Sequence, residues 1–437
     1  MNKKRVILIS LDALSSTEFS IVKQLPNFSK LINEGSYCRQ EFSVYPSLTF
    51  PCHASIATGC NPGSHGIVSN YLFEPDSEIH HWNFYTSNLK RKAIWDYAVE
   101  NNKTVLNMSW PVSAGGNIRW SMPEMTPAKP KLWTIGNFFR QLEVFRRFGT
   151  PGFAFRSLLE EKQLVKNWFT GKQPNLDKHM IAQFQRAIRK YPFDIALFHI
   201  YGMDNAKHTH GVNSKAVHSY LNLYDTFIGN LIEFVDEQKK HGESVCLMVT
   251  GDHSQLPVKK SIFLNVLLND MNLCHYKNGK LVSWDALFAP CDGSAYLYVK
   301  NKNRRNEIAD MVRFKLENHP AIAKIFSPKE AAVLGADPDC ALMVEAADGY
   351  GTETNWCATV SLDQNFVTDS HCKGLHGYLP SHPDYQTLFF CYGPDVSNGY
   401  EIPNMAITDI TPSICHYFDM KTDPTDGKPI TKMFKNN

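Results

Sequence analysis

The 437-residue sequence has no long uninterrupted apolar run and almost no net charge. No stretch approaches the roughly 18 consecutive apolar residues of a membrane-spanning helix, so we expect no membrane span. The 45 Lys and Arg residues nearly balance the 43 Asp and Glu residues, and no block of like charges stands out. Binding to long nucleic acid or to a charged membrane surface is therefore disfavoured.

Nucleotide-cofactor fingerprints and a disulfide framework are also missing. The sequence contains neither a GxGxxG nor a P-loop motif, which argues against a nucleotide cofactor. Its eleven cysteines are an odd number without a CxxC pair. A basic start, Met1–Arg5, precedes an apolar stretch that Ser10 and Asp12 interrupt, with no convincing cleavage site. We therefore predict reduced thiols and a cytoplasmic protein.

Several short apolar runs are typical of strands buried on both faces of a parallel sheet. Hydrophobic residues make up 43% of the chain, enough for a large core. The four clearest runs are Val6–Ser10, Asp194–Ile200, Val245–Thr250 and Thr387–Tyr392. Helical periodicity lies between them, most clearly over 26–34 and 217–238. Strands that alternate with helices predict an α/β fold with a largely parallel sheet covered on both faces.

Two segments depart from this alternation. Residues 123–190 combine a Pro-rich start with aromatic and basic clusters, which we interpret as a helical insertion. Residues 257–338 contain a hairpin signal, Asn278-Gly279, and a strand-like run over 295–299. This second segment predicts a small α+β cap. The main α/β core would then comprise 1–256 and 339–437.

Polar residues with metal-binding or nucleophilic side chains follow the apolar runs in a fixed order. They are Asp12, Thr49 in Thr49-Phe50-Pro51, Asp204-x-x-x-His208, Asp252-His253 and His376-Gly377-Tyr378. Ligand sites in such sheets form beyond the carboxyl ends of strands, where Asp12, Asp204 and Asp252 would emerge. Three carboxylates, three imidazoles and one hydroxyl suit two adjacent divalent ions, with Zn²⁺ favoured and Mn²⁺ an alternative.

In this order the blocks resemble the alkaline phosphatase superfamily, most closely its type I phosphodiesterase/nucleotide pyrophosphatase branch. The resemblance extends from Val6 to about Tyr417 and includes Trp110-Pro111 and residues 374–380. It implies an alkaline-phosphatase-like three-layer fold and a threonine nucleophile at Thr49. The donor chemistry and the resemblance give the same two ligand sets: Asp12, Asp252 and His253 with Thr49, and Asp204, His208 and His376.

A helix from Thr49 to Thr58 would bring its positive end to the substrate phosphate. We predict Thr49 as its N-cap residue. The amide of Phe50 and the side chain of Asn70 are the expected donors to a non-bridging phosphate oxygen, and the resemblance supports Asn70. The resemblance also places Phe50 where that branch stacks a nucleobase, although packing in the core explains a phenylalanine equally well.

These features predict an enzyme that hydrolyses phosphate diesters or nucleotide pyrophosphates of small molecules through a phosphothreonine intermediate on Thr49. The main alternative is a phosphonoacetate hydrolase on the same metal site, in which Lys129 or Lys131 would bind the extra carboxylate. A phosphomonoesterase, an isomerase of the phosphoglycerate mutase type and an inactive metal-binding protein are less favoured. The sequence does not indicate an oligomeric state.

Overall fold

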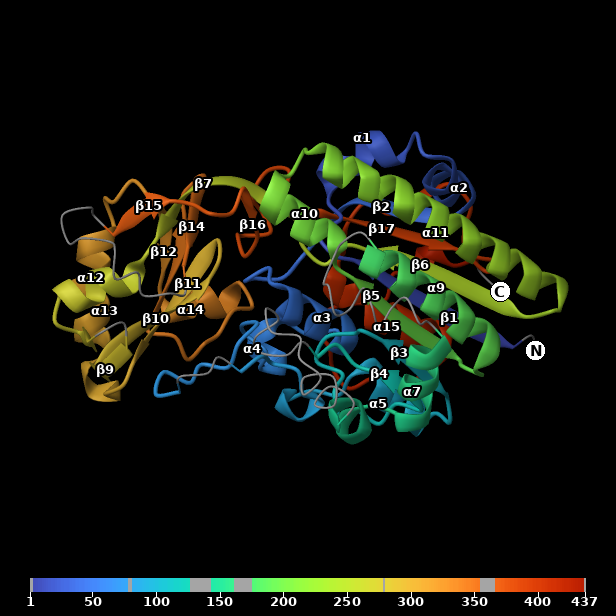
Figure 1. Ribbon diagram of the computed structural model, residues 1–437, viewed down its shortest axis with the longest axis horizontal. Helices are drawn as coiled ribbons and strands as arrows, with labels where there is room; N and C mark the ends of the chain where they lie inside the picture. The colour runs from blue at the N-terminus through green and yellow to red at the C-terminus, as the bar shows by residue number, and fades with distance from the viewer. Residues whose placement is uncertain are drawn as a thin grey trace.

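The computed structural model describes residues 3–77, 81–125, 143–160, 175–277, 280–353 and 366–435. Figure 1 shows two bodies side by side: a larger one that holds both chain ends and a smaller one built from a segment in the later half of the chain. The turn predicted at Asn278-Gly279 and the lysines Lys129 and Lys131 lie outside the described residues.

A nine-stranded sheet forms the centre of the larger body, in the order β18-β2-β17-β6-β1-β5-β3-β4, with β19 also paired to β2. β1 runs parallel to β5 and β6, and β3 runs parallel to β5 and β4. The largely parallel sheet predicted from the apolar runs is thus confirmed. The strands are β1 Lys4–Leu11, β2 Ser36–Phe42, β3 Val105–Met108, β4 Trp120–Met122, β5 Ile195–Ile200, β6 Ser244–Thr250, β17 Thr387–Tyr392, β18 Tyr400–Glu401 and β19 Met405–Ala406.

Helices cover both faces of this sheet and complete a three-layer fold (Figure 1). Alternate side chains of β1 enter two separate cores, Ile7 and Ile9 on one face and Val6 and Leu8 on the other. The first core takes residues from α2 Pro26–Glu34, α7 Pro151–Glu160, α9 Asn175–Lys190, α10 Gly202–His210 and α11 Lys215–Lys240. The second takes residues from α3 Thr49–Thr58, α5 Ile94–Glu100 and α15 Ile410–Tyr417. The helices predicted over 26–34 and 217–238 are α2 and α11.

One strand of the sheet runs against the prediction. β17 is antiparallel to β6 and to β2, whereas its apolar run was interpreted as a parallel strand. A continuous apolar run reports burial on both faces, and Phe389 and Phe390 do enter the two opposite cores. A strand that is buried on both faces has the same apolar pattern whether it is parallel or antiparallel. The sequence pattern therefore could not predict the direction of β17.

The smaller body contains both strands and helices. Its main sheet is antiparallel, in the order β10-β11-β13-β12, and β7 pairs with three further short strands. The strands are β7 Leu256–Ile262, β8 Cys274–Lys277, β9 Lys280–Trp284, β10 Ala286–Cys291, β11 Ser294–Val299, β12 Ile322–Phe326, β13 Leu342–Ala346, β14 Gly349–Thr352, β15 Val367–Asp369 and β16 Gly374–Leu375. The helices are α12 Leu264–Asp270, α13 Arg305–Leu316 and α14 Pro328–Val333.

Strand pairing in the smaller body continues past residue 338, where the sequence predicted the end of the cap. β13 inserts between β11 and β12, and β14, β15 and β16 all pair with β7. These pairings join segments far apart in the chain, and no local pattern reveals them. Within the predicted insertion 123–190, α7 and α9 are helical, and residues 126–142 and 161–174 lie outside the described part.

A buried acid, Glu41 on β2, predicts how stability changes with pH. Burial raises the pKa of Glu41 to about 8, although Thr250 and Thr387 donate hydrogen bonds to its Oε2 at 2.7 and 2.9 Å. The folded protein therefore holds this proton more tightly than the unfolded chain. The stabilisation of the folded state by protonated Glu41 is fully present below about pH 4.5, and it is lost as the pH rises to about 8. We expect the free energy of unfolding of Glu41→Gln to exceed that of wild type by about 2–4 kcal/mol at pH 9. At pH 4 the two free energies of unfolding should be equal.

Urea unfolding at both pH values measures this difference. The matched control is Glu401→Gln on the neighbouring strand β18, where the glutamate is exposed and pairs with Arg39 at 2.6 Å. The control variant should keep the pH dependence of wild type. Equal stability of Glu41→Gln and wild type at pH 9 would contradict the conclusion that Glu41 is a buried carboxyl group with a raised pKa.

Candidate active site

The register of the central strands brings three of the predicted ligands to one edge of the sheet. Leu11 pairs with Ile200 and Ser10 pairs with Thr250, so β1, β5 and β6 end at the same level. Asp12 follows β1 directly, Asp204 lies in the first turn of α10 after β5, and Asp252 follows β6. The three carboxylates therefore lie together at the carboxyl ends of the strands, where they were expected.

Asp12, Asp252 and His253 converge as one buried group, as predicted for the first ligand set. Candidate ligand atoms of all three lie within 4.8 Å of one another. The Nε2 atom of His253 is 3.4 Å from Asp12 Oδ1 and 3.3 Å from Asp252 Oδ2. Among the described residues, neither of these two carboxylate oxygens has a hydrogen-bond partner.

This first set fits a divalent cation. Two ligands of a tetrahedral zinc ion, at bond lengths near 2.0–2.2 Å, lie about 3.3–3.5 Å apart, which matches both separations from His253. Buried carboxylate oxygens without hydrogen bonds are costly unless a cation compensates them. Burial raises the pKa of Asp252 to about 6, and it lowers the pKa of His253 to about 4, so the imidazole is neutral at pH 7 and able to bind a metal.

The three residues of the second predicted set lie near one another, but they do not form a single group of candidate ligands. Asp204 groups with His376 and with His253, again within 4.8 Å, whereas His208 is not in that group. His208 instead places its Nε2 3.3 Å from Asp204 Oδ2, and its Nδ1 bonds to the Gly374 carbonyl at 2.7 Å. Both residues lie in α10, and this confirms the helical spacing that was predicted for Asp204 and His208.

The two histidines of this second set also differ in protonation. Burial lowers the pKa of His208, but the charge of Asp204 outweighs it and raises the pKa to about 12. The two side chains thus form a charged pair, and a cation between them would displace the shared proton. Burial keeps His376 neutral at a pKa of about 4, and among the described residues its Nδ1 has no hydrogen-bond partner. Gln255 donates to Asp204 Oδ1 and orients the carboxylate.

Thr49 lies at the start of α3 beside the first ligand set. Its Oγ1 is 3.2 Å from His253 Nε2, the atom that also faces Asp12 and Asp252. The predicted helix over 49–58 is found, but Thr49 is its first helical residue and the extended Leu48 occupies the N-cap position. The threonine hydroxyl is therefore directed to the ligand set and does not cap the helix.

The two groups predicted as phosphate donors contact each other. The Phe50 amide donates to Asn70 Oδ1 at 2.9 Å. Because this acceptor must be the amide oxygen, the NH₂ group of Asn70 occupies the other branch of the side chain. The Phe50 amide thus fixes the orientation of the Asn70 side chain, and the role of Asn70 as a phosphate donor stays a prediction.

Phe50 takes the packing role that the sequence left open. Its side chain is 1% exposed, in a core cluster with Ala54, Ile67 and Phe84. Aromatic surface near Asn70 comes instead from the half-buried Tyr71 and Trp82, whose ring centroids are 4.4 Å apart. Stacking of a base on Phe50 remains a prediction that would require this cluster to open.

Sequence reasoning missed a hydrogen-bonded chain behind the first set. His199 on β5 bonds through Nε2 to Asp12 Oδ2 at 3.1 Å and through Nδ1 to Glu124 at 2.7 Å. Burial opposes a charge on His199, but the two carboxylates raise its pKa well above the usual value. The topology offered a signal, since Glu124 follows β4 at the same carboxyl edge as Asp12.

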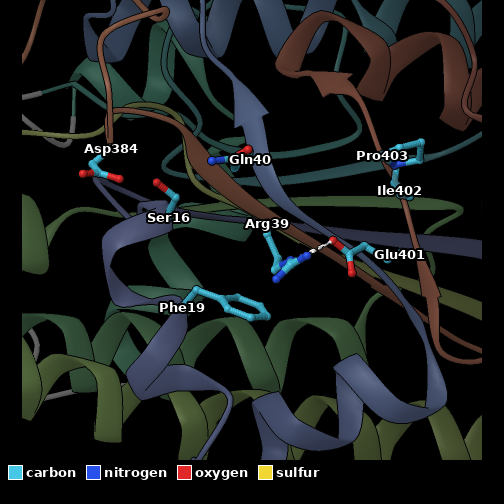
Figure 2. Close-up of a pocket in the computed structure, with 8 residues that line it drawn as sticks. All are labelled: Ser16, Phe19, Arg39, Gln40, Asp384, Glu401, Ile402 and Pro403. Atoms are coloured by element: carbon cyan, nitrogen blue, oxygen red, sulfur yellow. Dashed lines mark hydrogen bonds and ion pairs between the residues drawn. The ribbon is translucent and has the colours of Figure 1, made fainter.

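A hollow of about 340 Å³ lies elsewhere on the larger body (Figure 2). Its only described basic side chain, Arg39, is already paired with Glu401. None of the predicted site residues is part of its lining, which consists of Ser16, Phe19, Arg39, Gln40, Asp384, Glu401, Ile402 and Pro403. This hollow is therefore separate from the residues of the predicted site.

A hydroxyl at a helix start beside carboxylate and imidazole sets, on a three-layer parallel sheet, defines the class of alkaline-phosphatase-like hydrolases. The family model for type I phosphodiesterase / nucleotide pyrophosphatase matches residues 6–379. The chain belongs to this family, whose members are hydrolases.

The chain is similar to several named relatives. It is 25% identical over 414 residues to ectonucleotide pyrophosphatase/phosphodiesterase family member 1 of Mus musculus, covering 92% of this chain and 39% of that protein. It is 22% identical over 428 residues to the bis(5'-adenosyl)-triphosphatase ENPP4 of Homo sapiens, covering 97% and 80%. This chain thus spans well under half of the mouse relative's length.

Solved structures confirm the fold. Murine ectonucleotide pyrophosphatase / phosphodiesterase 5 superposes with a TM-score of 0.67 at 18% identity, covering 99% of this chain and 100% of that one. An inactive variant of the same murine protein, solved in complex with AMP, gives a TM-score of 0.66. No helix in the described part of this chain has the length and apolar character that a bilayer crossing requires.

Proposed function

We propose that this protein hydrolyses phosphate diesters or nucleotide pyrophosphates through Thr49, at a centre for two divalent cations. The observation that carries the proposal is the 3.2 Å approach of Thr49 Oγ1 to His253 Nε2, within the set completed by Asp12 and Asp252. A hydroxyl placed there is positioned as a nucleophile. The family membership and the AMP complex of the murine relative support a nucleotide-like substrate.

The chain's own residues divide the reaction between them. Thr49 Oγ1 loses its proton to solvent and forms a bond to phosphorus. The bond from phosphorus to the leaving oxygen breaks, and the leaving group departs into solvent, which leaves phosphothreonine. Water then attacks the phosphorus, the Oγ1–phosphorus bond breaks, Thr49 regains a proton and the phosphate product is released. Asn70, positioned by the Phe50 amide, donates to a non-bridging oxygen. Bound divalent cations, of which Zn²⁺ best fits the donor set, would supply positive charge to the attacking and leaving oxygens.

A cytoplasmic location stays a prediction. The described cysteines, ten in number, are all free, and nine of them are buried. Free thiols are usual in reducing compartments. The comparisons give this location no support of their own.

A substrate panel tests the proposed reaction. Zinc-loaded protein is assayed with thymidine 5'-monophosphate p-nitrophenyl ester, p-nitrophenyl phosphate and phosphonoacetate. We expect kcat/KM for the nucleoside diester to exceed that for the monoester by at least about tenfold, because a diester fills both sides of the phosphate with binding groups. If phosphonoacetate is the only substrate that is turned over, the alternative function, a phosphonoacetate hydrolase with Lys129 or Lys131 as carboxylate ligand, would replace the proposal.

A further inference from the structure

A turn of the smaller body is anchored directly to the segment that carries His376. The turn between β10 and β11 consists of Asp292 and Gly293. The Gly293 amide donates to the His376 carbonyl at 2.7 Å, and Ser294 Oγ donates to the Gly377 carbonyl at 2.8 Å. A Cβ atom on Gly377 would lie 1.9 Å from the Cys291 carbonyl oxygen, so the close contact leaves no room for a larger residue at this position.

This anchoring places one further carboxylate at the ligand cluster. Asp292 has a left-handed backbone, with φ of 57°, and its Oδ2 is 3.4 Å from His376 Nε2. Its side chain is 35% exposed, against 5% for His376, so the carboxylate lies at the outer rim of the site. It was not among the predicted site residues, and it does not group with two other candidate ligands among the described residues.

Asp292 interacts electrostatically with residues on two parts of the predicted site. Burial raises the pKa of Tyr71, which follows Asn70 in the chain, and the charge of Asp292 adds to this increase. On the other side, the charges of His376 and His208 act on Asp292 itself. The carboxylate is therefore 3.4 Å from one histidine of the second ligand set and within electrostatic range of the residue that follows Asn70.

We propose that Asp292 is a specificity-determining residue, whose carboxylate disfavours phosphate groups with two negative charges and so favours diesters over monoesters. The inference rests on the proposed function. A monoester carries nearly two charges at pH 8, because its second pKa is near 6, whereas a diester carries one. A fixed negative charge at the rim repels the additional charge of the monoester more than it repels the diester.

The same charge acts on inorganic phosphate, the product that monoester hydrolysis would release. Phosphate carries nearly two charges at pH 8, so Asp292 weakens its binding and its inhibition of the enzyme. A nucleoside monophosphate released from a diester also carries two charges, so the carboxylate assists its departure. One residue thus selects the substrate and limits product inhibition.

The test compares Asp292→Asn with wild type, both loaded with zinc, at pH 8. Asparagine keeps the shape and tolerates the left-handed backbone, and Asp292→Gly is a second variant that removes the charge without backbone strain. The two substrates, thymidine 5'-monophosphate p-nitrophenyl ester and p-nitrophenyl phosphate, share one leaving group. The matched control is Asp348→Asn, which removes another cap carboxylate that pairs with a histidine, 2.9 Å from His382 Nε2.

For Asp292→Asn we expect the diester-to-monoester ratio of kcat/KM to fall about tenfold, chiefly through faster monoester turnover. The inhibition constant of inorganic phosphate should fall by a similar factor. Zinc content per protein, measured by atomic absorption, should equal that of wild type. Asp348→Asn should change none of the three.

Two results would overturn the inference. The first is an unchanged substrate ratio and unchanged phosphate inhibition in both Asp292 variants. The second is loss of zinc in Asp292→Asn, which would make Asp292 a metal ligand. Failure of the proposed function is distinguishable from either, since wild-type protein would then fail to cleave the nucleoside diester at all.

Discussion

Thr49→Ala is expected to lower kcat/KM for a nucleoside phosphodiester by at least about a thousandfold, because it removes the only atom that can carry the phosphoryl group in the proposed mechanism. The Oγ1 atom at 3.2 Å from His253 Nε2 has no substitute in alanine, while the helix and the ligand sets keep their contacts. Steady-state assay of the zinc-loaded variant measures the loss. Its zinc content and thermal midpoint should stay close to those of wild type.

The matched control is Thr58→Ala, at the other end of the same helix. The Thr58 hydroxyl donates to the Ala54 carbonyl at 2.8 Å and lies in the core, so its loss affects stability by about 1 kcal/mol and leaves turnover per folded molecule unchanged. Acid quenching during turnover, followed by peptide mass spectrometry, should find phosphate on Thr49 in wild type. Diester cleavage by Thr49→Ala within tenfold of wild type would rule out the threonine mechanism.

The parts of the fold that could be predicted are those in which the local pattern of apolar residues identifies a strand or a helix. The runs that became β1, β5 and β6 are buried on both faces, and α2 and α11 show a clear helical period. The direction of β17 and the place of β13 between β11 and β12 were not predictable, because both depend on pairing between segments distant in sequence.

In the candidate site, too, some features could be predicted from the sequence and others depend on contacts between distant segments. Asp12, Asp204 and Asp252 were predictable because strand ends of a parallel sheet meet at one edge. The burial of Phe50 was not, since it depends on Trp82 and Phe84 closing over the ring.

Residues that reach the ligand sets from elsewhere had no local signature at all. Asp292 arrives through a turn of the other body, and His199 is one of six buried side chains in β5. Lys207 lies between Asp204 and His208 in the sequence and resembles any exposed helical lysine. Its burial shows only when the first loop of the chain packs against α10.

Lys207 supports the last prediction, which concerns the frame of the site. Its side chain is 1% exposed, and its Nζ donates to both oxygens of the buried Glu18 at 3.0 Å and to the Ala13 carbonyl at 2.7 Å. Ala13 in turn donates its amide to Asp252 Oδ1 at 3.0 Å from a left-handed backbone, with φ of 62°. Lys207 therefore connects the helix of the second ligand set to the loop that holds the first.

We expect Lys207→Met to lower the free energy of unfolding by about 3–5 kcal/mol, because methionine keeps the apolar stem but leaves the Glu18 charge buried without a partner. Urea unfolding measures this loss. The double variant Lys207→Met/Glu18→Gln should recover most of it, since the uncompensated charge is then gone. Lys260→Met, which breaks an exposed pair with Asp369, is the matched control and should unfold almost as wild type does.

The double variant also separates stability from positioning. Once folded, it still lacks the bond from Lys207 to the Ala13 carbonyl, so the two ligand sets are no longer held at a fixed spacing. We expect it to retain zinc less tightly than wild type in competition with a chelator, by about tenfold or more, as for other changes behind metal ligands. Wild-type zinc retention in a stable double variant would show that Lys207 serves folding alone, and that Asp12, Asp252 and Asp204 keep their positions without it.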